Sequence, residues 1–150
     1  MNRIDRKDIK AVISDGKIQV TCIESGVKIY WHDIEITQGI GLNSALNPLI
    51  GIWSDSSKAD WEILENKNYS LIARNSWKDL PVTQLWKIEI KDGDSISWEV
   101  EMEVEEDMEI NEKRALILIS ERYQHWVTAS EQGDFPNIEK WETISLEDYS

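Results

Sequence analysis

The feature that most constrains the fold is a hairpin pattern over residues 82–105, VTQLWKIEIKDGDSISWEVEMEVE. Apolar and polar side chains alternate along both arms, and the triplet DGD at 92–94 separates them. A period of two is typical of half-buried β-strands, and a glycine between aspartates is typical of a tight turn. Both apolar sets face one core only if the numbers of paired residues have an even sum, and a three-residue loop satisfies this condition. The predicted cross-strand pairs are Ile90–Ile96, Ile88–Trp98 and Lys87–Glu99.

Shorter stretches with the same alternation precede this hairpin. KIQVTCIE (17–24), VKIYW (27–31) and IEIT (34–37) are separated by turn signals, and WEILEN and YSLIARNS flank a further turn at Lys67-Asn68. Residues 38–60 are rich in Gly, Ser and Asn and are expected to be the longest irregular stretch. WKDLP (77–81) is expected to be a loop or strand edge.

Two segments follow the hairpin. KRALILISERY (113–123) is uniformly apolar through ALILIS, which predicts a central strand covered on both faces. The tail, 134–150, is expected to contain a last strand around IEKWETI.

About eight to ten short strands without a convincing helix predict an all-β fold. We expect an antiparallel β-sandwich, supersandwich-like, with its strands in jelly-roll or meander order. The length of 150 residues suits one domain, residues 1–150, either complete or cut from a larger protein.

The charge balance limits the partners. The chain has 29 acidic and 16 basic residues, a net charge of -13. Nucleic acids and anionic membranes are bound through clustered Lys and Arg, so neither is an expected partner. The N-terminus, MNRIDRKDIKAV, has no apolar region of the kind that signal peptides carry, and no apolar run is long enough to span a membrane. We expect a cytoplasmic location by default.

Acidic side chains also line one face of the second hairpin arm, at Glu99, Glu101, Glu103 and Glu105. Same-face neighbours on a strand lie about 6–7 Å apart, so water screens these carboxylates from one another. We interpret this row as a solvated face that discourages edge-to-edge aggregation, rather than as a metal or catalytic cluster.

The residues that most often perform chemistry are sparse. Cys22 is the one cysteine, and its alternation with apolar neighbours predicts a buried, unreactive thiol. His32 and His125 belong to no acid–base or metal-binding motif. We therefore assign no catalytic residue, no metal and no cofactor, and we favour a protein that is not an enzyme.

Tryptophan is the anomalous residue, with eight copies against a single phenylalanine. Trp86 and Trp98 belong to the core face of the hairpin. Those at strand ends or in loops are Trp31, Trp53, Trp77 and Trp126. In IWSDSSKADW (52–61), two indoles bracket a polar loop, and they are either core pegs or a platform for a ligand. An indole offers a flat apolar face and one N–H donor, which suits the C–H face and hydroxyl rim of a sugar.

Four stretches together resemble a known family: DGKIQVTCIESGVKIYW, IWSDSSKADWEI, PVTQLWKIEIKDGDSISWEVEMEVEED and ALILISERYQHW. The pattern, over roughly residues 10–127, is similar to the β-supersandwich of galactose-mutarotase-like and glycoside-hydrolase-associated domains. The resemblance implies a carbohydrate-linked domain. A complete mutarotase fold is about twice this length, and its paired histidines and glutamate base have no counterpart here, so no catalytic residue is carried over.

Three functions follow. The first is a non-catalytic carbohydrate-binding or accessory module of a polysaccharide-related protein. Its predicted ligand-binding residues are Trp31, Trp53, Asp55, Asn43 and Arg74, and Gln84 qualifies only if it lies at the mouth of a strand. The second is a structural or assembly domain, with the indoles in the core or in an interface, acting as a homodimer or within a multidomain parent. The third is a small sugar isomerase or lyase that uses His125 with Glu121 or Tyr123, set on one face of a strand.

Overall fold

The computed structural model describes residues 8–48 and 52–135, which divide into two units after Ser120. In the first unit the strands are β1 (Ile9–Ser14), β2 (Ile18–Ile23), β3 (Gly26–Trp31), β4 (Ile34–Glu35), β5 (Thr37–Pro48), β6 (Ser54–Asp55), β7 (Asp60–Lys67), β8 (Ser70–Ser76), β9 (Val82–Lys91), β10 (Ser95–Val104) and β11 (Ile110–Ile119). A 3-10 turn, η2, spans Ser56–Lys58. The second unit contains β12 (His125–Val127) and β13 (Gln132–Asp134). Among the described residues, no helix has the length and apolarity to cross a membrane.

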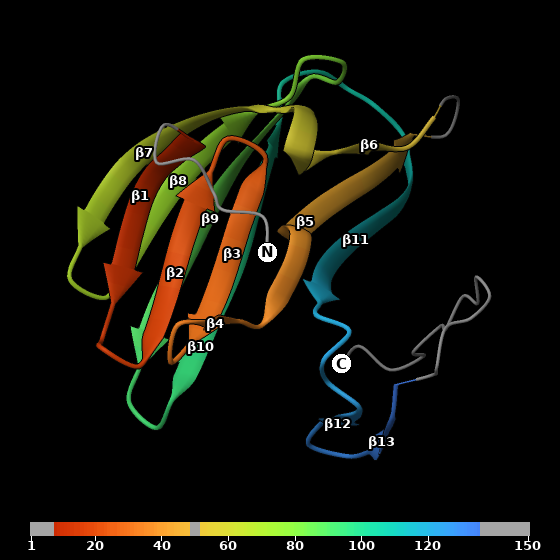
Figure 1. Cartoon of the computed structure of the whole chain (residues 1–150). Coiled ribbons are helices and arrows are strands. Elements are labelled where there is room, and N and C mark those ends of the chain that lie inside the picture. The colour runs from red at the N-terminus through yellow and green to blue at the C-terminus, as the bar shows by residue number, and fades with distance from the viewer. Residues whose placement is uncertain (1–7, 49–51, 136–150) are drawn as a thin grey trace. The chain divides into compact units, whose positions relative to one another are not determined.

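Two antiparallel sheets make up the first unit (Figure 1). The first sheet has the order β1-β2-β3-β5-β11, with β4 added to β3 and β6 added to β5. The second has the order β10-β9-β8-β7, so neighbours in space are neighbours in sequence. This arrangement confirms the predicted all-β, antiparallel sandwich.

The β9–β10 hairpin forms as the alternation predicts. Its loop holds three residues, and Gly93 and Asp94 take the left-handed φ values of 81° and 55° that close it. The three predicted pairs, Ile90–Ile96, Ile88–Trp98 and Lys87–Glu99, are all present. The inward residues of β9 are therefore buried between the sheets.

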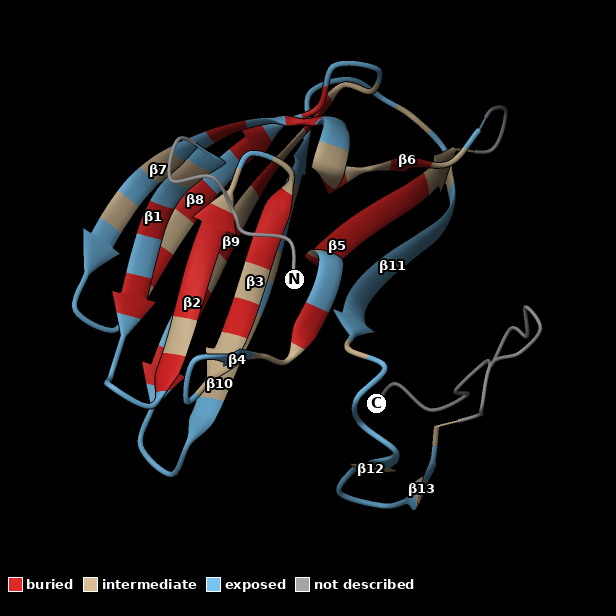
Figure 2. Ribbon diagram, in the orientation of Figure 1, coloured by how far each residue is buried: buried red, intermediate tan, exposed pale blue. Residues whose placement is uncertain are grey.

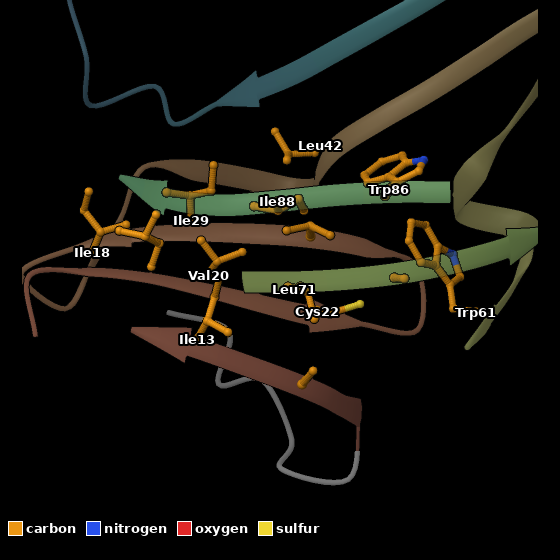
Figure 3. Packing of buried hydrophobic residues seen from close by; sticks show 14 residues of the cluster. Ile13, Ile18, Val20, Cys22, Ile29, Leu42, Trp61, Leu71, Trp86 and Ile88 are labelled. Carbon is orange, nitrogen blue, oxygen red and sulfur yellow. The ribbon is translucent and has the colours of Figure 1, made fainter. Parts of the chain in front are cut away.

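The core between the sheets is built around tryptophan (Figure 3). Trp86 is fully buried, and Trp61 packs against it edge to face with the ring centroids 4.8 Å apart. The Trp98 ring also contacts Trp86, with the ring centroids 4.8 Å apart, and Trp98 is half-buried at the margin of the core. Cys22 is fully buried in this core, as predicted, and burial raises the pKa of its thiol to about 11.

Within 38–60, residues 38–48 are not irregular as their composition predicts, because β5 spans Thr37–Pro48. Gly39 and Gly41 have φ values of 57° and 71°, which bend the strand without ending it. A Cβ on Gly41 would lie 2.0 Å from the carbonyl oxygen of Val27, and a Cβ on Gly26 would lie 2.2 Å from that of Ile40. The glycines permit a close approach of β5 to β3.

The prediction for 113–123 is half right. Residues 110–119 do form a strand, β11, but it is the last strand of its sheet and is not covered on both faces. Figure 2 shows β11 exposed along its length, next to a β5 that is buried through most of its second half. The predicted strand around IEKWETI lies outside the described residues.

Gly41→Ala should lower the free energy of unfolding more than a glycine substitution in an open turn does. The new Cβ meets backbone, which cannot swing aside, so we expect a loss of about 3 kcal/mol or more in unfolding free energy. Gly93→Ala is the matched control, because Gly93 also has a positive φ but no atom within 4 Å of the added Cβ. Its cost should be about 1–2 kcal/mol from backbone strain alone. Urea unfolding followed by tryptophan emission measures both, and equal losses would contradict the close-approach argument.

The Cys22 thiol should make stability fall at alkaline pH. Its ordinary pKa of 9.0 is raised to about 11 in the fold, so the folded chain holds a proton that the unfolded chain releases between these values. The contribution of the protonated thiol to the free energy of unfolding is fully present below pH 9. It is lost as pH rises toward 11, by about 1 kcal/mol per pH unit. Cys22→Ala removes the titrating group, so the stability difference between the two proteins should depend on pH in this window. A constant difference would show that the thiol does not titrate as stated.

Candidate functional site

Three indoles are buried in the interior, and the N–H of each donates a hydrogen bond to a nearby oxygen. Trp61 donates to the carbonyl oxygen of Ser56 at 2.9 Å, and Trp77 donates to the Asn75 side-chain oxygen at 2.8 Å. Trp86 donates to the Gln84 side-chain oxygen at 3.0 Å. All three indoles are buried, so none of them is a platform for a ligand.

Gln84 lies between the sheets, not at the mouth of a strand. Its amide donates to the hydroxyl of Ser44 at 2.8 Å, and the Ser44 N–H in turn donates to the hydroxyl of Ser56 at 3.0 Å. This buried chain of polar groups ties β9 to β5 and to η2. Its role is structural, because every step is a protein–protein hydrogen bond inside the core.

Two of the predicted ligand residues, Asn43 and Asp55, lie together. The Asn43 amide donates to Asp55 at 3.2 Å, and the same carboxylate accepts the N–H of Ser57 at 2.7 Å and caps η2. Partial burial acts to raise the pKa of Asp55, but the hydrogen bonds from Ser57 and Asn43 outweigh it and lower the pKa. The carboxylate therefore holds η2 against β5.

Trp53 is half-buried and is covered by a residue that the sequence analysis missed. The Arg114 guanidinium lies 4.4 Å from the centroid of the indole, in a cation–π contact. With the Asn47 amide oriented to satisfy its hydrogen bonds, the indole N–H donates to the Asn47 oxygen at 3.2 Å. Glu112 accepts from Arg114 at 2.7 Å and fixes the guanidinium. Only the pairing of β5 with β11 brings these groups together, so no local sequence signal could have revealed the contact.

The other two predicted residues lie on different elements. Trp31 ends β3, is half-buried, and contacts His32 edge to face at 4.5 Å. Arg74 is exposed on β8 and pairs with Glu62 of β7 at 3.5 Å. The five predicted residues therefore do not form one cluster: Asn43, Trp53 and Asp55 lie along β5 and β6, while Trp31 and Arg74 do not. Ligand binding by any of them stays a prediction.

In the second unit, Glu121, Tyr123 and His125 do not share one strand face. Residues 121–124 form a turn and an irregular segment, and β12 begins only at His125. The prediction that they are spaced along a strand is wrong. The imidazole of His125 instead pairs with the exposed carboxylate of Asp134, across the β12–β13 ladder. Over residues 8–48 and 52–135, no group of three or more His, Cys, Asp or Glu side chains is placed to hold a metal.

The most unusual surface of the first unit is β11 itself. Its apolar run leaves large side chains in water: Leu116 is 38% exposed, Ile117 51%, Leu118 38% and Ile119 36%. Alternation sends Ile117 and Ile119 to one face of the sheet and Leu116 and Leu118 to the other. An edge strand that is apolar on both faces is uncommon in an isolated domain.

The backbone of β11 also has a defined set of outward-pointing groups. The N–H of Ser44 points away from β11 and donates to Ser56. Ser44 and Ala115 are therefore a pair without mutual hydrogen bonds, and the N–H and C=O of Ala115 point away from β5. Ser120 is turned inward, since its N–H donates to the Ile36 carbonyl. Alternation then places Ala115, Ile117 and Ile119 with their peptide groups facing outward, at the open side of the strand.

Other sheet edges differ in chemistry. The exposed face of β10 carries Glu99, Glu101 and Glu103, and exposed residues of β7 include Asp60 and Glu62. Like charges repel a second strand of the same kind, which is how edges are protected from unwanted pairing. From Ala115 to Ile119, β11 lacks this protection. We define these five residues, with their outward peptide groups, as the β11 edge.

No family model matches this chain, and no curated protein and no solved structure is significantly similar to it.

Proposed function

We propose that this domain is an assembly module that binds another β-strand along the β11 edge. The observation that carries the proposal is the coincidence of three outward-facing peptide groups with four exposed large apolar side chains. Strand addition to an open sheet edge supplies main-chain hydrogen bonds, while the side chains on alternate faces supply the apolar contact.

The positions of the indoles favour this function over an open sugar platform. The interior is stabilised by Trp61, Trp77 and Trp86. Trp53, in the loop before β6, contacts Arg114 of β11. That contact supports the β11 edge from the neighbouring element. The tryptophans thus build a rigid scaffold whose open side is apolar, as expected of a structural or assembly domain.

A labelled peptide of residues 112–122, EKRALILISER, should bind the intact chain saturably in a fluorescence-anisotropy titration. The same peptide N-methylated at Ile117 should bind at least about 10-fold more weakly, because one outward N–H can no longer donate. A scrambled peptide of equal composition controls for apolar adhesion. If all three peptides bind alike, or none binds, strand addition at β11 is wrong.

A second candidate, carbohydrate binding at Trp53, is favoured by the stacked Arg114 guanidinium and by the amide and carboxylate groups of Asn43, Asn47 and Asp55 nearby along β5 and β6. An indole flanked by such donors and acceptors matches the chemistry of a sugar ring. The resemblance to galactose-mutarotase-like domains points the same way.

For this candidate we expect a saturable shift in tryptophan emission with one class of soluble glycan, α- or β-linked. Trp53→Ala should abolish binding of that glycan by calorimetry, whereas Trp31→Ala, a matched half-buried indole on β3, should leave it intact. Binding that survives Trp53→Ala would rule out this site. If no glycan binds at all, the candidate function itself is wrong.

A further inference from the structure

We infer that the strand bound along the β11 edge is β11 of a second copy of this chain, paired antiparallel about a two-fold axis at Ile117. The inference rests on the proposed function and adds the identity of the partner and the register. A symmetric pair of this kind uses the same patch twice, so the patch must be complementary to itself. The sequence of β11 can be tested for that property directly.

Symmetric registers centred on Leu116, Ile117 or Leu118 all set outward peptide groups opposite one another. The one centred on Leu118 would leave Ala115 opposite a residue past the end of β11. In the register centred on Ile117, Ile117 faces Ile117, Ala115 faces Ile119, and Leu116 faces Leu118 of the second copy. Every position from 115 to 119 then meets an apolar residue on its own face of the sheet. The outward groups of all three residues of each copy exchange hydrogen bonds.

The register centred one residue earlier is worse. It sets Arg114 opposite Leu118 and Lys113 opposite Ile119 of the second copy. Cationic ends would then lie against apolar side chains, and Ile117 would face only Ala115. Arg114 already contacts Trp53 and Glu112, which holds its guanidinium beside the indole. The distribution of charge along the strand therefore selects the Ile117 register.

Charge also favours β11 over β10 as the place of self-association. A pair formed through β10 would instead oppose two rows of glutamates in a chain that already carries a net charge of -13. Self-association through β11 avoids that repulsion at the contact itself.

The mass of the full chain should be measured by sedimentation velocity over a concentration series, from about 1 to 200 µM. We expect a monomer at the low end and a dimer at the high end. Ile117→Lys places two ammonium groups at the two-fold axis and should weaken the dimer at least about 10-fold. Val12→Lys is the matched control: Val12 is 39% exposed on β1, at the opposite end of the sheet from β11, and its replacement adds the same charge. Circular dichroism should show that both variants are folded.

A wild-type chain that remains monomeric throughout would overturn the inference, as would equal dimerisation of the Ile117→Lys and Val12→Lys variants. If the monomeric chain still binds the 112–122 peptide, the assembly function stands and only the second copy is wrong. If the chain neither dimerises nor binds the peptide, the assembly function and the proposed partner are both wrong.

The register has its own test. Directly opposed residues of a hydrogen-bonded antiparallel pair have Cα atoms about 5.5 Å apart, which a disulfide can span. Ile117→Cys should therefore form a covalent dimer under mild oxidation, while Leu116→Cys should form far less. Cys22 is buried and does not compete. The reverse order would place the axis at Leu116 and overturn the Ile117 register.

Discussion

The single close approach between β3 and β5 is the constraint on which the rest of the structure depends. These strands share only one paired position, Val27 with Leu42, and it forms beside Gly26 and Gly41. Because neither glycine has a side chain, two backbones meet at a distance that any Cβ would prevent. From this joint β5 turns away from β3 and presents its other side to β11 (Figure 1). The two glycines thus permit the contact between β3 and β5 that joins β11 to the rest of the sheet.

The interior explains why this chain uses so much tryptophan. Each buried indole of Trp61, Trp77 and Trp86 fills a large volume and also donates to an oxygen on β8, β9 or η2. Phenylalanine would fill similar space but would remove the donors to the side-chain oxygens of Asn75 and Gln84. Gln84 and Ser44 extend the same network across the two sheets. The two indoles of IWSDSSKADW therefore have different surroundings: Trp61 is buried in the core, and Trp53 stacks with the Arg114 guanidinium.

How much the sequence could predict depended on whether the signal was local. The β9–β10 register followed from alternation and loop length, because a one-residue slip would have turned every apolar side chain of one arm to water. Burial of Cys22 and Trp86 followed from the same alternation. The composition of 38–60 predicts a loop because of residues such as Gly39 and Gly41, although here these glycines permit a close strand contact. The run ALILI in β11 predicts a central strand, because apolarity alone does not distinguish a strand buried in its own domain from one with an unpaired edge. The Trp53–Arg114 contact depends on strand pairing across the whole unit, which no local pattern encodes.

The account makes one central claim: the outward peptide groups of β11 are satisfied by a second strand. Residue-resolved hydrogen exchange at low and high protein concentration tests it most directly. The inward amides of Leu116 and Ser120 should be protected at both concentrations, Leu116 by pairing with β5 and Ser120 by its bond to the Ile36 carbonyl. The outward amides of Ala115, Ile117 and Ile119 should exchange rapidly in dilute solution and become protected as concentration rises. Outward amides that exchange rapidly at every concentration would contradict the account.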